Sequence, residues 1–162
     1  MAYVLDANIF IEAARRYYAF DIAPSFWQAL LQQARDGYVL SIDRVKNEIE
    51  RGNDELSKWV KNDFHPWFAS TAEMDVVGSY RKVMSWVQRQ NQFSNAARTS
   101  FASGADGWVI AYAISKGCIV VTHERFNPNI KRKVPIPNVC MAFKLKYVDT
   151  FQMLRDLGVR LP

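Results

Sequence analysis

A helix followed by a strand is predicted by the sequence Ser103-Gly-Ala-Asp-Gly-Trp-Val-Ile-Ala-Tyr-Ala-Ile-Ser-Lys-Gly-Cys-Ile-Val-Val-Thr122. Apolar residues recur at helical spacing from Asp106 to Lys116, which is typical of a helix with one buried face. Residues 118–121 are all apolar. A short, continuously apolar run is typical of a strand buried on both faces of a parallel sheet. This stretch therefore favours an α/β fold.

Short apolar runs and helical patterns alternate along the rest of the chain as well. Strands are expected at residues 3–5, 38–42, 118–122 and 139–143. Helices are expected at residues 9–18, 26–35, 43–52 and 150–157, with Asn8 as the cap of the first one. Residues 54–98 are expected to be helical, with a turn over residues 64–72. The alternation predicts one domain over residues 1–162, a three-layer α/β/α sandwich with a short, mostly parallel sheet.

The composition is that of a compact globular protein. A chain of 162 residues typically forms one domain, and the 49% hydrophobic content supplies a core and argues against disorder. Cys118 and Cys140 both lie in apolar runs, so we expect buried free thiols and no disulfide framework. The longest uncharged stretch, residues 22–34, is shorter than the roughly 20 residues that span a bilayer. We therefore expect a cytoplasmic protein without a membrane segment.

Four acidic residues fall at the carboxyl ends of the predicted strands. Asp6 directly follows the first strand, and Glu48 lies early in the helix after the second. Asp106 begins the helix before the third strand, and Glu124 lies two residues beyond that strand. Ligands of open parallel sheets bind at this edge. Crowded carboxylates repel one another unless a pKa rises or a cation binds. Because oxygen ligands select hard cations, the pattern predicts a Mg²⁺ or Mn²⁺ site.

Each acid also has an ordinary structural interpretation. Asp6 could stabilise a turn, and Asp106 could complete a capping box at the start of its helix. Glu48 and Glu124 could be solvated surface charges. The coincidence of four such residues at one edge of one sheet is what favours the metal site.

The sequence around these acids resembles the PIN domain family. The resemblance is carried by four blocks in the family's order: Tyr-Val-Leu-Asp6-Ala-Asn8, Val45-Lys-Asn-Glu48-Ile, Gly-Ala-Asp106-Gly-Trp-Val-Ile-Ala and Val-Val-Thr122-His-Glu124. It extends from Tyr3 to about Phe143 and is greatest to bacterial PIN-like proteins related to VapC-type toxins. It implies a Rossmann-like α/β/α sandwich and a Mg²⁺-dependent endoribonuclease, the toxin of a type II toxin–antitoxin pair. A cognate antitoxin and a homodimer are possible partners.

The resemblance also implies roles for individual residues. Asp6, Glu48 and Asp106 match the family's principal metal-binding acids. Asn8 and Thr122 match its supporting polar positions. Glu124 stands where the family more often has Asp, so we expect it to bind a metal weakly or through water.

Basic residues predict contact with a polyanion. The chain has 21 Lys+Arg against 16 Asp+Glu, a net charge of +5. Setting the four acids of the predicted site aside leaves +9 on the rest of the chain. Arg125 and the run Lys131-Arg132-Lys133 follow Glu124 closely, so they are candidates to hold an RNA substrate. An ordinary solvated loop is the alternative interpretation of that run.

Two other functions remain open at this stage. His65 and His123 could cleave RNA without a metal, but both would then have to reach one phosphate. Alternatively, the protein could be a catalytically silent PIN-like module that binds RNA or another protein. The presence of all the main acids disfavours that alternative.

Overall fold

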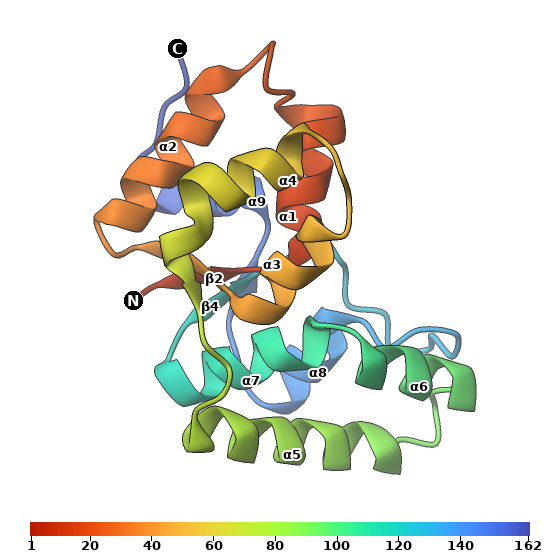
Figure 1. Cartoon of the computed structure of the whole chain (residues 1–162). Coiled ribbons are helices and arrows are strands. Elements are labelled where there is room, and N and C mark those ends of the chain that lie inside the picture. Colours follow the sequence, from red (N-terminus) through yellow and green to blue (C-terminus); the bar gives the residue numbers. More distant parts are fainter.

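A parallel sheet forms the centre of the protein, and the computed structural model describes all 162 residues around it (Figure 1). Its five strands are short, run in the same direction and follow the order β3-β2-β1-β4-β5. They are β1 (Tyr3–Leu5), β2 (Val39–Ile42), β3 (Phe68–Ala69), β4 (Ile119–Val121) and β5 (Tyr147–Val148). The expected α/β class is therefore confirmed.

Helices cover both faces of the sheet and complete three layers. In Figure 1, α5, α6, α7 and α8 lie below the sheet, and α1, α2, α4 and α9 lie above it. The helices are α1 (Ala7–Glu12), α2 (Pro24–Arg35), α3 (Asp43–Glu50), α4 (Glu55–Trp59), α5 (Met74–Arg89), α6 (Asn95–Ser103), α7 (Asp106–Lys116), α8 (Ile136–Ala142) and α9 (Thr150–Asp156). π-Helical turns extend α1 through Ala13–Tyr17 and α4 through Val60–Phe64, and a 3₁₀ turn, His65–Trp67, leads into β3.

One hydrophobic core runs through all three layers. It joins 42 buried residues, and every residue of β1 and β4 belongs to it. These two central strands have no polar face, as the apolar run of residues 118–121 predicted. Cys118 and Cys140 are buried free thiols, as expected. The core thus fixes the carboxyl ends of β1 and β4 side by side, where Asp6 and Thr122 emerge.

The predicted strand at residues 139–143 is wrong. These residues belong mostly to α8, and the missing strand is β5, Tyr147–Val148. Pro137 lies in the first turn of α8, where proline is tolerated because the first amides of a helix have no intrahelical partner. Val139 and Cys140 are fully buried in this helix. Periodicity alone does not separate such a short buried helix from a buried strand.

Three smaller predictions also need correction. The turn expected over residues 64–72 contains β3 as an edge strand. The first helix begins at Ala7 with Asp6 at the cap position, so Asn8 is not its cap. A capping box over Ser103–Asp106 would place Ser103 at the cap position of α7, but Ala105 occupies that position and no side chain forms a cap hydrogen bond.

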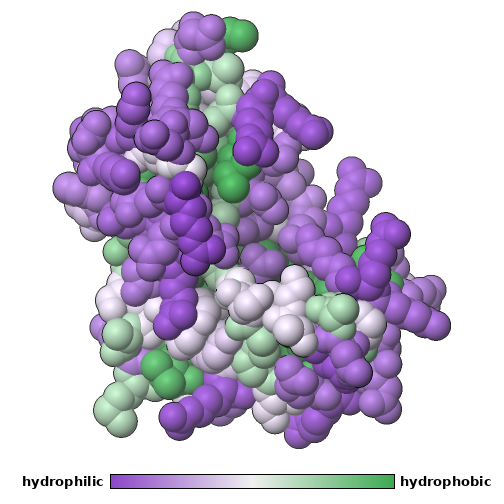
Figure 2. Space-filling model, turned by 45° about the vertical axis from the view of Figure 1, so that its right-hand side comes forward, coloured by the Kyte–Doolittle hydropathy of each residue, from purple (hydrophilic) through white to green (hydrophobic).

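The outer surface is largely hydrophilic. The face seen in Figure 2, turned forward from the right-hand side of Figure 1, shows apolar groups only in small patches between longer hydrophilic side chains. None of the helices combines the length and the apolar character that crossing a membrane requires.

Two glycines test how closely α7 packs against its neighbours. A Cβ on Gly107 would lie 3.1 Å from Phe101 Cε1 and 3.2 Å from Tyr80 Cε1, whereas a Cβ on Gly78 of α5 would meet nothing within 4 Å. We predict that Gly78→Ala stabilises the protein by up to about 1 kcal/mol, since alanine favours helix. Gly107→Ala should instead destabilise it by about 1 kcal/mol, because both rings must shift. Urea denaturation of the two variants measures the difference, and equal stabilisation by both would contradict the close packing.

Candidate functional site

Asp6 is the most deeply buried of the four predicted acids. It directly follows β1 and is 1% exposed, and the Thr122 hydroxyl donates a hydrogen bond of 3.3 Å to its Oδ2. Burial, followed by the negative charges of Asp106 and Glu124, raises the pKa of Asp6 well above its usual value. The Asn8 amide and the Thr122 hydroxyl act in the opposite direction, but do not compensate. A charged Asp6 is therefore costly here unless a cation lies nearby.

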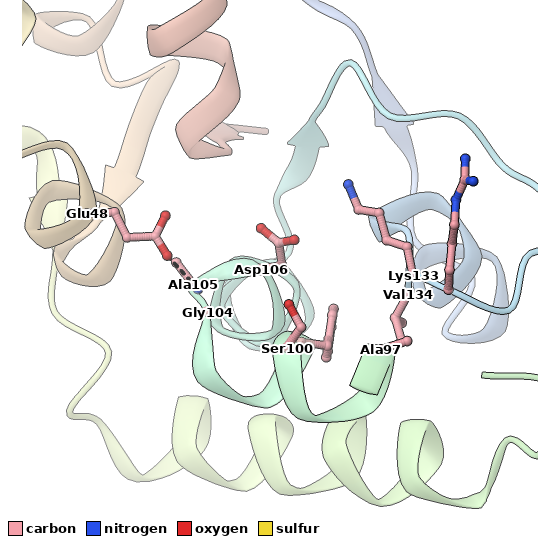
Figure 3. Close-up of a pocket in the computed structure, with 10 residues that line it drawn as sticks. Glu48, Ala97, Ser100, Gly104, Ala105, Asp106, Lys133 and Val134 are labelled. Atoms are coloured by element: carbon pink, nitrogen blue, oxygen red, sulfur yellow. Dashed lines mark hydrogen bonds between the residues drawn. The ribbon is translucent and has the colours of Figure 1, made fainter. Parts of the chain in front are cut away.

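Asp106 begins α7 and extends into the middle of a pocket of about 290 Å³ (Figure 3). Burial is the main cause that raises the pKa of Asp106 to about 7. The charges of Glu124 and Glu48 raise it further, while the Lys133 ammonium lowers it. The charges of Asp106 and Glu124 act on Asp6, and the charge of Glu124 acts on Asp106, so these three predicted acids form one electrostatic cluster.

Glu48 reaches the same pocket from α3. Its Oε1 accepts a hydrogen bond of 3.0 Å from the Ala105 amide, directly before Asp106. The first amides of a helix lack intrahelical partners, so Glu48 satisfies one of them at the start of α7. Its Oε2 makes no hydrogen bond, and the Glu48 side chain extends toward the side of the pocket where Asp106 lies (Figure 3). One carboxylate oxygen of Glu48 therefore stabilises the start of α7, and the other is free to bind a ligand in the pocket.

Glu124 has both carboxylate oxygens engaged. Oε1 accepts a hydrogen bond of 2.8 Å from the Ile136 amide, and Oε2 lies 3.0 Å from Lys133 Nζ. The Glu124 amide also donates to the Thr122 hydroxyl, at 3.1 Å. These contacts hold the loop between β4 and α8 against the site. A metal at Glu124 would have to share an oxygen with Lys133 or with the Ile136 amide.

The predicted basic residues separate into two groups. Lys133 and Arg132 line the pocket of Asp106 and Glu48, whereas Lys131 and Arg125 do not. Lys133 extends from the wall opposite Glu48 (Figure 3). Burial lowers the pKa of Lys133, but the hydrogen bond and charge of Glu124, together with Asp106 and Asp6, outweigh burial and raise it. The Lys133 ammonium is thus the main cation facing the acids.

The chemistry of these side chains fits a hard divalent cation, but the arrangement is not a closed coordination group. No three of the chain's His, Cys, Asp and Glu side chains lie close enough together to hold one metal ion. The fit rests on the raised pKa values of Asp6 and Asp106. A cation next to buried carboxylates favours their charged form and lowers those pKa values.

Some predicted residues do not reach this cluster. The Asn8 side chain is exposed and makes no hydrogen bond to an acid; only its amide acts on Asp6. His65 precedes β3 at the amino edge of the sheet, while His123 follows β4 at the carboxyl edge. The two histidines therefore lie at opposite edges, and the paired-histidine mechanism is not supported.

Sequence reasoning missed the contacts that hold α3 against α7. The Arg44 guanidinium lies 3.9 Å above the centre of the Trp108 ring, and Trp108 stacks on Tyr80 at 3.7 Å. Arg44 is one turn before Glu48, and Trp108 is two residues after Asp106. This stack therefore fixes the helix that carries Glu48 relative to the helix that carries Asp106. The four-residue spacing of Arg44 and Glu48 was the only signal in the sequence.

Fold and site together define a three-layer α/β protein with an acidic pocket at the carboxyl edge of a parallel sheet. The chain belongs to the family described as a domain of unknown function, DUF4411, whose profile matches residues 3–161. No curated protein matches the sequence.

Two solved structures share the fold. The crystal structure of VapBC2 from Rickettsia felis bound to a DNA fragment from their promoter is 14% identical, with a TM-score of 0.54. That match covers 92% of this chain and 98% of the other. The crystal structure of FitAcB from Neisseria gonorrhoeae is 15% identical, with a TM-score of 0.51, and the match covers 90% and 95% of the two chains. At these identities the similarity establishes the fold alone, over nearly the full length of each neighbour.

The raised pKa of Asp106 predicts a pH-dependent stability. Between about pH 4 and pH 7 the folded protein holds a proton on Asp106 that the unfolded chain has released, so its stability falls as the pH rises through this window. Asp106→Asn removes this loss. In EDTA we expect the variant to melt a few degrees above the wild type at pH 7.5 and close to it at pH 4.5, as measured by circular dichroism. A lower melting temperature of the variant at pH 7.5 would contradict a raised pKa of Asp106 caused mainly by burial.

Proposed function

We propose that the protein is a metal-dependent endoribonuclease of the PIN domain type, and that it is the toxin of a type II toxin–antitoxin pair. The observation that carries this proposal is that Glu48 and Asp106 line one pocket with Lys133, while Asp6 lies near enough to Asp106 for their charges to interact. The three acids come from three separate elements of the fold. Acids with raised pKa values beside a cation are typical of sites that perform chemistry.

Asp6 and Asp106 would hold a Mg²⁺ or Mn²⁺ ion, with Glu48 contributing through its free oxygen. Glu124 would contribute through water, because both of its oxygens already have partners. The bound ion would lower the pKa of a water molecule and offset negative charge on the phosphate. Thr122 would keep the Asp6 carboxylate in place through its hydrogen bond.

Lys133 and Arg132 would hold the RNA phosphate against the acids. Both line the pocket, and Lys133 extends from the wall opposite Glu48 (Figure 3), so a phosphodiester that enters it would lie between cations and carboxylates. Glu124 orients the Lys133 ammonium by its 3.0 Å ion pair. Hydrolysis by water would leave a 5′-phosphate and a 3′-hydroxyl, because the RNA 2′-hydroxyl takes no part.

Two similarities support the toxin role, one of sequence and one of fold. The sequence blocks resemble VapC-type toxins, and the fold is shared with structures named VapBC2 and FitAcB. On this basis we propose a cognate antitoxin as the protein partner and a homodimer as a further possible assembly.

A second candidate function is a catalytically silent PIN-like module that binds RNA or a protein. One observation favours it, namely that no three acids lie close enough together to hold one ion. In this case Lys133 would serve as the permanent counterion of the acids, and no metal would be needed.

Cleavage of a 5′-labelled RNA separates the two functions. With Mg²⁺ or Mn²⁺ we expect cleavage by the wild type, and a loss of at least about 100-fold in Asp6→Asn and Asp106→Asn, because each removes a carboxylate that would hold the ion. Asp75→Asn, at an exposed acid on α5, serves as the matched control and should cleave normally.

Excess EDTA should also stop the reaction. RNA binding without cleavage under either metal would instead identify the silent module. Cleavage that persists in EDTA and leaves a 2′,3′-cyclic phosphate would contradict the metal-dependent mechanism.

The toxin role has its own test. We expect expression of the wild type to arrest growth of the host cell, and Asp6→Asn to grow normally at the same protein level. Co-expression of the neighbouring gene should restore growth. Arrest by both forms, or by neither, would contradict a toxin that acts through this site.

A further inference from the structure

A second pocket lies on the other side of Glu124 from the acidic site. It measures about 520 Å³ and occupies the carboxyl ends of β4 and β5. Thr122 and Glu124, which contact the acidic cluster, also form part of its wall. Pockets of this size are large enough for a nucleotide. An RNA strand bound at the acidic site could therefore continue into this second pocket.

Aromatic rings gather in this pocket. Tyr17, His123 and Phe151 lie with their ring centres 5.5–6.0 Å apart. Tyr17 is 49% exposed, and Phe126 on the same wall is 44% exposed. The His123 ring is held by a 2.9 Å hydrogen bond with Thr150. The pocket thus presents ring surfaces that are fixed by packing and hydrogen bonding, and part of them is open to solvent.

Two unpaired cations flank the rings. Arg125 and Arg155 are exposed and line the pocket, and neither forms an ion pair. The acids nearby are already engaged. Asp149 accepts a hydrogen bond from the Gln152 amide as the cap of α9, Glu124 is paired with Lys133, and Glu12 is paired with Arg16. Asp149 keeps its negative charge, but the two arginines exceed it, so the pocket has a net positive charge once Glu124 is paired with Lys133.

We propose that this pocket binds an unpaired nucleotide of single-stranded nucleic acid, next to the acidic site. The base would stack on the exposed ring of Tyr17, and Arg125 and Arg155 would contact the phosphates on either side of it. Exposed aromatic rings beside cations are the usual means of binding single strands without strict sequence preference. A duplex hides its bases inside the stack and cannot use such rings.

The inference rests on the proposed function, since it extends the path of the RNA beyond the acids. It also gives Arg125 a role, because the structure places this residue outside the pocket of Lys133. The aromatic residues come from three distant segments: the end of the α1 extension, the end of β4 and the start of α9. The fold alone brings them together.

The test is fluorescence anisotropy with a labelled, unstructured 12-nucleotide RNA in EDTA, where the metal-dependent reaction cannot proceed. We expect Tyr17→Ala to weaken binding about tenfold and Tyr17→Phe to leave it nearly unchanged, since both aromatic rings stack. Tyr38→Ala is the matched control, because Tyr38 is also 49% exposed but precedes β2 at the opposite edge of the sheet.

Charge reversals provide a second set of variants that remove no packed side chain. Arg125→Glu combined with Arg155→Glu should weaken binding and flatten its dependence on salt. Arg35→Glu, at the exposed end of α2, should do neither. Single-stranded DNA of the same sequence should follow the same pattern, while the annealed RNA duplex should be insensitive to Tyr17→Ala.

Wild-type affinity in both the Tyr17→Ala and the double-arginine variants would overturn the proposal. So would an equal effect of Tyr17→Ala on single-stranded and duplex RNA. If these variants bind RNA normally but no longer bind the product of the neighbouring gene, the pocket belongs to a protein partner. If Asp6→Asn abolishes cleavage while these variants behave like the wild type, only this inference fails. If the Tyr17→Ala and double-arginine variants lose RNA binding, but neither the wild type nor any variant cleaves RNA, the nucleotide-binding proposal is supported and the ribonuclease proposal fails.

Discussion

Asp6 carries a carboxylate that is almost completely buried at the end of the central strand, with two further acids close enough to act on its pKa. Burial and repulsion both oppose its charge, and a protein usually relieves such a conflict by protonation or by a nearby cation. The surrounding structure supplies partial compensation only. Thr122 donates one hydrogen bond, and Lys133 provides one positive charge from the opposite wall. The geometry of the pocket follows from holding these groups together.

Contacts between α3 and α7 maintain that geometry over a long separation in the sequence. Glu48 bonds the Ala105 amide, and Arg44 lies on the Trp108 ring one helical turn away. Two different interactions thus join the same pair of helices at neighbouring points. Arg44 is exposed, and a cation–π contact at an exposed site contributes about 0.5–1 kcal/mol, less than a hydrogen bond to a charged group. Neither helix can rotate without losing both contacts, so the separation of Glu48 and Asp106 is fixed.

The sequence was sufficient for the central part of the fold and for the edge on which the acids lie. Residues 3–5 and 118–121 are continuously apolar, which is typical of strands buried on both faces, and Asp6 and Glu124 then follow at the same edge of the sheet. Residues 139–143 could not be assigned in this way. They are buried in α8, and a buried helix of two turns has the same apolar pattern as a buried strand. β5 has only two residues, too few to show any alternation.

The hydrogen-bond and ion-pair partners of the site residues were harder to predict from the sequence than the places of those residues in the fold. Glu124 was expected as a weak metal ligand because of its extra methylene, yet its oxygens are taken by Lys133 and the Ile136 amide. These partners are nine and twelve residues away along an irregular loop, and no periodic pattern describes such a segment. The stacking of Arg44 on Trp108 was missed for a different reason. It depends on how α3 and α7 cross, which the sequence of either helix alone does not determine.

The charges at the site explain why the net charge of the chain was a poor guide by itself. The +5 of the whole chain is an average over a basic surface and an acidic pocket. Glu48 and Asp106 line the pocket with two cations, Arg132 and Lys133, and the carboxylates of Asp6 and Glu124 lie close enough to interact with this group. Four carboxylates and two cations leave two net negative charges when all are ionised. One divalent cation would bring this group to neutrality, and a second would make it positive. Under the proposed function a phosphodiester, with its own negative charge, would then enter a pocket that no longer repels it. Without the cation, the same phosphate would meet buried carboxylates whose pKa values already show the cost of crowding negative charge at this edge of the sheet.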